Sequence, residues 1–214
     1  MLTFGLFFFD YDLDGLPDIF AADGHVADDV SVLQPSLHYA EPPLLFRNRG
    51  NGKFESMSDK VGPAMRQPMV ARGAAYLDYD NDGDLDIVVN TNNGPARLLR
   101  NDNGNKNDML RVKLVGTKSN RDAIGAKVTV TANSGAKMME MIKTGSSYLS
   151  QSELPLTFGL GKPAPGKTVG LEIAWPSGRK ESLAHVAANQ FITVEEGKGI
   201  ISVRPIEFSP AFEH

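Results

Sequence analysis

The sequence contains no cysteine, no long apolar run and no strong excess of either charge. Without cysteine, its 214 residues cannot form a disulfide framework, a thiolate metal site or a cysteine nucleophile. The formal charge of −4 is too mild for a protein that coats nucleic acid, and a hydrophobic content of 41% is too high for a disordered chain. No stretch approaches the roughly eighteen apolar residues of a transmembrane helix, so we expect no membrane span.

Turn-forming residues are abundant, and the acidic residues are unevenly placed. The 21 glycines and 13 prolines favour many turns and short strands over long helices. Residues 1–107 hold 16 acidic and 9 basic side chains, whereas residues 108–214 hold 10 and 13. Nine of those sixteen acidic residues lie in two short windows, 10–18 and 78–86. The two halves of the chain therefore differ in their chemistry.

The two acidic windows are copies of one pattern, D-x-D-x-D-G-x-x-D, and they are 68 positions apart. The match extends outward, because apolar residues 7–9 precede the first copy as residues 75–77 precede the second, and apolar residues follow both. An internal repeat of this length predicts a modular β array.

Carboxylates at positions 1, 3, 5 and 9 of each copy would repel one another unless a cation lay among them. A hard divalent ion suits this pattern, and calcium, with its flexible shell of oxygen ligands, suits it better than magnesium. Gly15 and Gly83 permit the sharp turn that brings a backbone carbonyl and the last aspartate round. We therefore predict two Ca²⁺ ions per chain. The predicted ligands are Asp10, Asp12, Asp14, the Leu16 carbonyl and Asp18 in the first loop, and Asp78, Asp80, Asp82, the Asp84 carbonyl and Asp86 in the second.

The loops allow two other interpretations, an EF-hand and a plain turn. In an EF-hand, the bidentate glutamate at loop position 12 would fall at Ala21 and Val89, and β-rich runs replace the flanking helices. A plain Asp/Gly-rich turn between strands stays open for either loop alone. Two copies in equivalent contexts favour the metal site.

The loops and the segments around them resemble the FG-GAP/VCBS repeat family, which forms β-propeller blades in integrin α subunits. Residues 45–54 resemble the hairpin that closes a blade, and residues 98–104 repeat its first half. The resemblance implies calcium binding between the strands of each blade. A propeller closes with roughly four to eight blades, whereas residues 1–104 provide about two. We therefore expect the remaining blades to come from a longer chain or from an oligomer.

Apolar and polar residues alternate in the second half, for example over residues 110–115 and 169–175. This period of two, with turn signals between the runs, predicts antiparallel strands of a β-sandwich over residues 108–198. Residues 105–107 would form the linker, and residues 199–214 a C-terminal tail. We expect the basic side chains of these strands to lie on solvated faces. The predicted fold class is all-β: an incomplete β-propeller followed by an antiparallel β-sandwich.

The second half resembles the ASPIC/UnbV domain. The matching stretches are residues 110–116 together with 120–126, then 145–152, 156–161 and 175–179. The same order of modules, propeller repeats and then this domain, is found in bacterial ASPIC/UnbV proteins and in the cartilage acidic protein family. The resemblance implies no catalytic residues.

Catalytic signatures are weak. Residues 161–168 satisfy the P-loop expression G-x-x-x-x-G-K-[ST], but a strand-like run follows where the phosphate site needs a helix, and two prolines remove N–H donors. The four histidines have no short metal-ligand spacing. We expect no enzyme activity.

The predicted function is that of a non-catalytic, calcium-binding interaction, adhesion or scaffold module with a protein or glycan ligand. Calcium is retained outside the cytosol, which favours a secreted, periplasmic or cell-surface setting, with a signal peptide upstream of this chain. One alternative is RNA binding, for which Arg111, Lys113 and Lys127 would have to form one basic patch. Another is an accessory part of a larger calcium-dependent enzyme. We do not expect nucleic acid as the partner.

Overall fold

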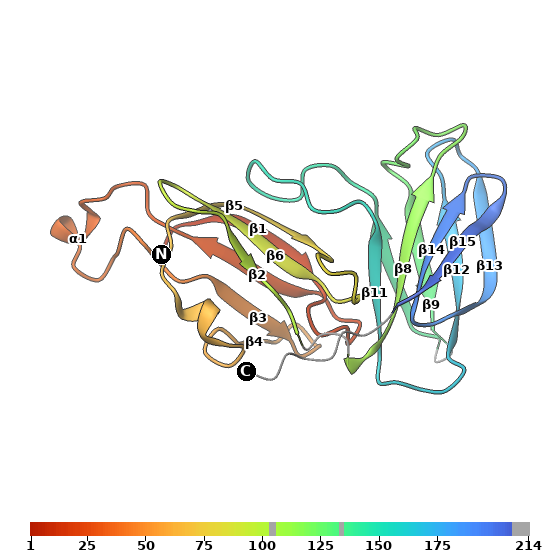
Figure 1. Ribbon diagram of the computed structural model, residues 1–214, viewed down its shortest axis with the longest axis horizontal. Coiled ribbons are helices and arrows are strands. Elements are labelled where there is room, and N and C mark those ends of the chain that lie inside the picture. The colour runs from red at the N-terminus through yellow and green to blue at the C-terminus, as the bar shows by residue number, and fades with distance from the viewer. Residues whose placement is uncertain (103–105, 133–134, 207–214) are drawn as a thin grey trace.

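The computed structural model describes residues 1–102, 106–132 and 135–206, which form two β-rich halves (Figure 1). Residue 105 of the predicted linker and residues 207–214 of the predicted tail lie outside these ranges. No helix within the described ranges has the length and apolar character needed to cross a membrane. The all-β class predicted from the sequence is confirmed.

The first half contains, within its described residues, two antiparallel sheets, each built from one copy of the repeat. We call them blade 1 and blade 2. Blade 1 is formed by β1 (Thr3–Phe9), β2 (Asp18–Asp23), β3 (Leu44–Asn48) and β4 (Phe54–Ser56). Blade 2 is formed by β5 (Ala71–Leu77), β6 (Asp86–Thr91) and β7 (Arg97–Leu99). Two short helices lie in the connections, α1 (Val30–Leu33) and η1 (Pro63–Arg66).

The two blades pack face to face because alternate side chains of each strand are apolar. One face of blade 1 presents Phe7, Phe20 and Leu45, which are all buried. These side chains belong to one cluster with Ile87 and Val89 of blade 2. Over the described residues the two sheets do not close into a ring. The incomplete propeller stays a prediction.

The second half is a β-sandwich, and its described strands form two sheets. The apolar faces of the sheets enclose a core that includes Leu110, Val128 and Trp175. The first sheet contains, in order, β10 (Lys137–Met141), β9 (Lys127–Thr131), β12 (Thr168–Ala174) and β13 (Lys180–Ala187). The second contains β11 (Leu156–Gly161), β8 (Asp108–Val115), β14 (Gln190–Glu195) and β15 (Gly199–Pro205).

Two details of the sandwich differ from the sequence prediction. Strand β14 pairs with β8 in parallel, because the chain crosses to the other sheet and back between the two strands. Residues 199–205, which the sequence places in a tail, form β15 and pair with β14. Strand β15 is an edge strand, and its apolar residues Ile200, Ile201 and Val203 are partly or largely exposed, so they form no buried face of the kind that the other strands have.

The two halves are joined by the β10–β11 connection, residues 142–155, as well as by the chain between β7 and β8. In Figure 1 this connection extends from the sandwich across β5. The Tyr76 amide donates to Ser152 Oγ, and the Glu153 amide donates to the Tyr76 carbonyl, both at 3.1 Å. The Leu6 amide of β1 donates to Ser147 Oγ at 2.7 Å. The first strands of both blades therefore bond to the sandwich.

Arg111 does not lie on a solvated face, so the prediction for its side chain is wrong. It is 2% exposed on β8, whereas Lys113, two residues further on, is exposed as expected. The reason is that blade 2 covers the first part of β8 and places Asp78 against the guanidinium group. Arg111 is consequently not available to the basic surface patch that RNA binding would require.

Candidate metal centres

The acidic loops join the first and second strands of each blade. The first loop lies between β1 and β2, and the second lies between β5 and β6. Gly15 and Gly83 have φ angles of 90° and 98°, in the region that side chains with a Cβ rarely adopt. The turn at Gly15 brings backbone amides onto the first carboxylate, because Asp10 accepts from the Asp14 amide at 3.1 Å and from the Gly15 amide at 2.8 Å.

The last aspartate of each loop has a structural role that the sequence analysis missed. Asp18 accepts from the Tyr11 amide at 3.1 Å and from the Asn48 amide at 2.7 Å. In the second loop, Asp86 accepts from the amides of Tyr79 at 2.9 Å and Asn101 at 2.7 Å. Each carboxylate thus ties the start of its loop to the end of the third strand. The repeated Arg-Asn pairs at 47–48 and 100–101 were the available sequence signal.

The structure brings three carboxylates together in each loop. In each group, one oxygen from every residue lies within 4.8 Å of the others. Asp14 and Asp86 were predicted as ligands but lie outside these groups. The groups are Asp10, Asp12 and Asp18 in the first loop, and Asp78, Asp80 and Asp82 in the second. The carbonyl ligands predicted at Leu16 and Asp84 stay predictions.

Some of the clustered oxygens have no protein partner among the described residues. Asp12 Oδ1 and Asp78 Oδ1 are buried, and neither accepts a hydrogen bond there. A buried carboxylate oxygen without a partner carries a large desolvation cost, which a bound cation would offset. Oxygen donors that all carry negative charge match the preference of calcium and other hard divalent ions. The residues present therefore fit a metal ion.

Each loop also contacts an arginine that the sequence analysis did not select. Arg47 of β3 lies 2.6 Å from Asp12 and 3.0 Å from Asp14, and its side chain is 27% exposed. Arg111 of β8 pairs with Asp78 of the second loop and is almost fully buried. The two loops therefore balance part of their charge in different ways.

The pKa values of the loop carboxylates follow from burial and mutual repulsion. Burial, together with repulsion from neighbouring carboxylates, raises the pKa of Asp10 to about 8 and that of Asp18 to about 7. In the second loop, burial raises the pKa of Asp86 to about 6. Burial also raises the pKa of Asp78, but the Arg111 charge opposes that rise. Without a metal ion, the first loop therefore binds protons near neutral pH.

The first loop lies against the sandwich. A Cβ atom at Gly159 of β11 would lie 2.2 Å from Asp10 Oδ2, so only glycine fits where the loop approaches the strand. The Gly161 amide donates to the Leu13 carbonyl at 3.0 Å, and the Leu13 side chain packs with Met109. The first metal centre is therefore also a contact between the two halves.

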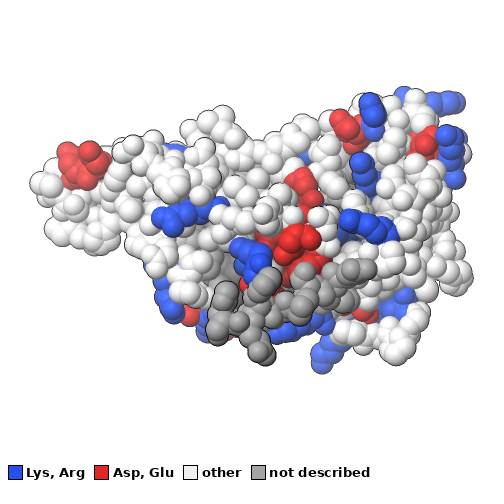
Figure 2. All heavy atoms as spheres, viewed as in Figure 1, with Lys and Arg blue, Asp and Glu red and all other residues white. Residues whose placement is uncertain are grey.

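The second loop meets the sandwich as well, through Asp78 with Arg111 and through Asn81, which accepts from Arg204 at 3.1 Å. Figure 2 shows acidic side chains grouped near the middle of the molecule, where the two halves of Figure 1 meet. Both acidic clusters are therefore placed where bound ions would act on the junction of the two halves.

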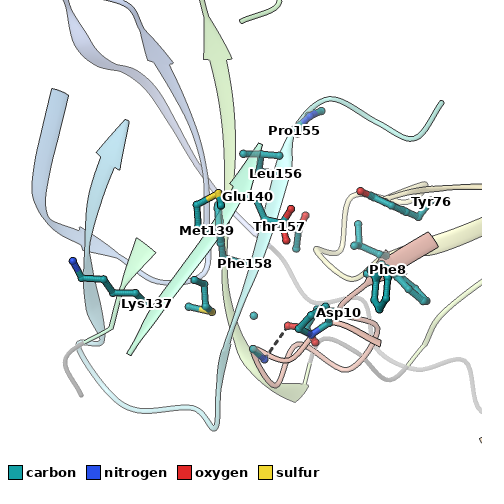
Figure 3. Close-up of a pocket in the computed structure, with 16 residues that line it drawn as sticks. Phe8, Asp10, Tyr76, Lys137, Met139, Glu140, Pro155, Leu156, Thr157 and Phe158 are labelled. Carbon is teal, nitrogen blue, oxygen red and sulfur yellow. Dashed lines mark hydrogen bonds between the residues drawn. The ribbon is translucent and has the colours of Figure 1, made fainter. Parts of the chain in front are cut away.

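A cavity of about 220 Å³ lies beside the first loop, between the end of β1 and strands β10 and β11. Figure 3 shows Phe8 and Tyr76 on the blade side and Met139, Glu140 and Thr157 on the sandwich side. Its lining combines apolar side chains with the polar or charged side chains of Asp10, Lys137, Glu140 and Thr157.

Two family models match separate parts of the chain. Residues 10–89, which include both acidic loops, match the model of the FG-GAP-like repeat. Residues 116–201, which include most of the sandwich, match the model of ASPIC and UnbV. The second match extends into β15, which agrees with the structure rather than with the predicted boundary at residue 198.

Curated relatives include cartilage acidic protein 1 of Homo sapiens and of Mus musculus. Each is 29% identical over 156 residues, which is 72% of this chain but 22% and 23% of the relatives. The chain thus spans about a fifth of their length. A putative cell adhesion protein from Bacteroides ovatus covers 78% of this chain and 80% of its own at 9% identity, with a TM-score of 0.23 that supports no conclusion about the fold. The family matches establish that the chain carries an FG-GAP-like repeat region followed by an ASPIC and UnbV domain, as its motifs predict.

Proposed function

We propose that the chain is a non-catalytic, calcium-dependent interaction module that binds one calcium ion in each acidic loop. The observation that carries the proposal is the pair of equivalent carboxylate clusters, each with a buried oxygen that accepts no hydrogen bond from the described residues. Asp10, Asp12 and Asp18 would hold the first ion, and Asp78 and Asp80 would contribute to the second. Bound calcium would supply the positive charge that these carboxylates lack.

The role of the ions would be structural. Both loops contact the sandwich, so their order affects how the blades and the sandwich dock. A metal site that forms only in the folded chain adds its binding free energy to stability. The rigid loops would then present a fixed surface to a protein or glycan partner. A secreted, periplasmic or cell-surface setting follows as part of the proposal, because the expected affinity suits extracellular calcium levels.

The test is thermal unfolding of the chain with calcium, with magnesium and with EDTA. At calcium one hundred times above its dissociation constant, one site stabilises the fold by about 2.7 kcal/mol. For a chain of this size, that corresponds to roughly 5–10 °C in Tm. The doubly substituted Asp12→Ala, Asp80→Ala chain should lose the increase. Identical melting curves in calcium and EDTA for the unsubstituted chain would sink the proposal.

We also propose that a further FG-GAP-like blade covers the free face of blade 1. In blade 2, the face formed by Tyr76, Ile87 and Leu99 packs on blade 1. The equivalent face of blade 1 presents Phe8, which is 61% exposed, and Ile19, which lies opposite it on β2. Because the two faces match position by position in the repeat, the same kind of neighbour fits both. A blade from a longer chain is the proposed occupant.

The chain itself can test this occupant. Sedimentation of the unsubstituted chain should show a monomer whose free face binds a hydrophobic dye, and Phe8→Ser should weaken dye binding. Fusion of a further FG-GAP-like blade ahead of β1 should protect Phe8 from the dye. A stable dimer of the present chain that Phe8→Ser dissociates would identify a second copy as the occupant and overturn the proposal.

A further inference from the structure

Arg111 is the most deeply buried cation in contact with an acidic loop, among the residues that the structure describes. It belongs to β8 of the sandwich and is 2% exposed. Its guanidinium group pairs with Asp78 of blade 2 and with Glu153 of the β10–β11 connection. Its Nε donates to Thr157 Oγ1 on β11 at 3.1 Å, and its guanidinium carbon lies 5.2 Å from the Phe191 ring centre. Packing on several sides fixes the direction of this side chain.

Because of this contact, the two carboxylate oxygens of Asp78 have different surroundings. Oδ2 accepts from Arg111, whereas Oδ1 is buried and accepts no hydrogen bond from the described residues. Asp10, at the same position of the first loop, accepts from backbone amides on both oxygens. Asp78 also has backbone hydrogen bonds from Asn81 and Gly83 of its own loop. The blade backbone therefore orients the first ligand position in both loops, and in the second loop a sandwich side chain, Arg111, orients it as well.

We propose that Arg111 is a positioning residue for the second metal loop, which it holds in the binding geometry by fixing Asp78 through Oδ2 and leaving Oδ1 for the cation. This inference rests on the proposed calcium binding. It also couples two events, because the arginine reaches Asp78 only when the sandwich is docked on blade 2. Calcium in the second loop and docking of the sandwich therefore strengthen each other by the same factor.

Arg111 affects calcium affinity in two opposite ways. Its positive charge repels a nearby cation, whereas its contact with Asp78 orients a ligand. Glu153 pairs with a second nitrogen of the guanidinium group and compensates that charge. Residues that orient metal ligands typically contribute tenfold to hundredfold in metal affinity. Truncation of Arg111 would also leave Asp78 free to rotate its partnerless oxygen away from the loop. We therefore expect orientation to outweigh repulsion.

The experiment measures calcium binding by calorimetry in a chain with a single site. Asp12→Asn removes the first site, and Arg111→Gln is then added. The expected result is a roughly tenfold to hundredfold weaker second site. Arg179→Gln, which removes an exposed sandwich arginine paired with Glu181, is the matched control and should change nothing. Calcium should also slow hydrogen exchange of the Glu153 amide, and Arg111→Gln should abolish that effect.

Thr157→Val provides a second test in case Arg111→Gln does not fold. Thr157→Val removes one hydrogen bond to Arg111 without exposing a buried charge, and it should weaken the second site several-fold. Unchanged calcium affinity in folded Arg111→Gln or, if that variant does not fold, in Thr157→Val would overturn the inference alone. Absence of calcium binding in the unsubstituted chain would instead overturn the proposed function, and the inference with it.

Discussion

The two copies of the repeat carry the same aspartate pattern in different surroundings. In the first copy, the nearby cation is Arg47, which comes from the same blade and remains partly exposed. In the second copy, it is Arg111, which comes from the other half of the molecule and is buried. Repeated modules can thus share the same ligand motif and yet differ in the residues that fix the geometry of its side chains.

The positions of the two arginines suggest opposite effects on a metal ion. Arg47 pairs with Asp12, which would bind the ion, and with the neighbouring Asp14. Its side chain is partly exposed, so it can move into solvent when the ion binds. Solvent screens a partly exposed ion pair of this kind more than a fully buried one, so less stability is lost when it breaks. Arg111 is held by Glu153 and Thr157 and cannot leave without exposing buried charge. Arg47 therefore competes with a cation, whereas Arg111 supports the site.

Substitution of one central aspartate should remove the calcium site of its own loop and leave the other site intact. Asp12→Asn and Asp80→Asn change the same position of the two copies, and each should weaken one site by roughly a hundredfold or more, because one charged ligand is removed. Calorimetry should then report one calcium ion per chain in place of two. Asp59→Asn, at an exposed aspartate outside the loops, is the control. Loss of both sites from either single substitution would contradict the independence of the two loops.

The second prediction compares equivalent aromatic residues of the two blades. Tyr76→Ser should lower the free energy of unfolding by about 2–3 kcal/mol, because the ring packs 5.2 Å from the Phe7 ring. Phe8→Ser, at the matching position of blade 1, should cost less than about 1 kcal/mol because its side chain is 61% exposed. Urea unfolding in the presence of calcium measures both. Equal costs would show that the free face of blade 1 is covered in solution.

The third prediction concerns pH. The raised pKa values of Asp10 and Asp18, about 8 and about 7, mean that both carboxylates carry protons at pH 6, which calcium must displace. Affinity of the first loop should therefore rise with pH up to about 8, by roughly tenfold or more from pH 6. The second loop should change less, because the pKa of Asp86 is about 6. Calcium affinity measured against pH in each single-site variant tests this prediction. The same pH dependence in both variants would contradict the expected difference between the loops.

The smallest expected effect belongs to Arg47. Arg47→Gln removes a competing cation from the first loop and should strengthen calcium binding there by roughly twofold to fivefold. The increase should shrink at high salt, since salt screens partly exposed pairs. A loss of affinity would show that Arg47 positions its loop as Arg111 does, and the contrast between the loops would disappear.

The sequence predicted the parts of this molecule that depend on local pattern. The repeat located both loops, and their glycines adopt the expected turn. Alternation located the sandwich strands but placed Arg111 in solvent, because a period of two says which side chains share a face and not what covers that face. The burial of Arg111 comes from blade 2, which lies more than thirty residues earlier.

The remaining differences have similar causes. Strand β15 was missed although residues 201–204 alternate, because the run is short and its apolar residues Ile201 and Val203 pack into no core. The parallel pairing of β8 with β14 depends on a crossover between strands far apart in sequence. Asp18 was expected to serve as a ligand, but its two amide contacts were not visible from the loop alone. Long-range contacts therefore account for what the sequence left open.

The most direct test of the account is a calcium titration of the unsubstituted chain by calorimetry at neutral pH. We expect the unsubstituted chain to bind two calcium ions. Asp12→Asn should remove one site, and addition of Arg111→Gln should weaken the site that remains. A chain that binds no calcium would contradict the proposed function. If Arg111→Gln leaves the calcium affinity of both sites unchanged, the proposed difference between the two loops is wrong.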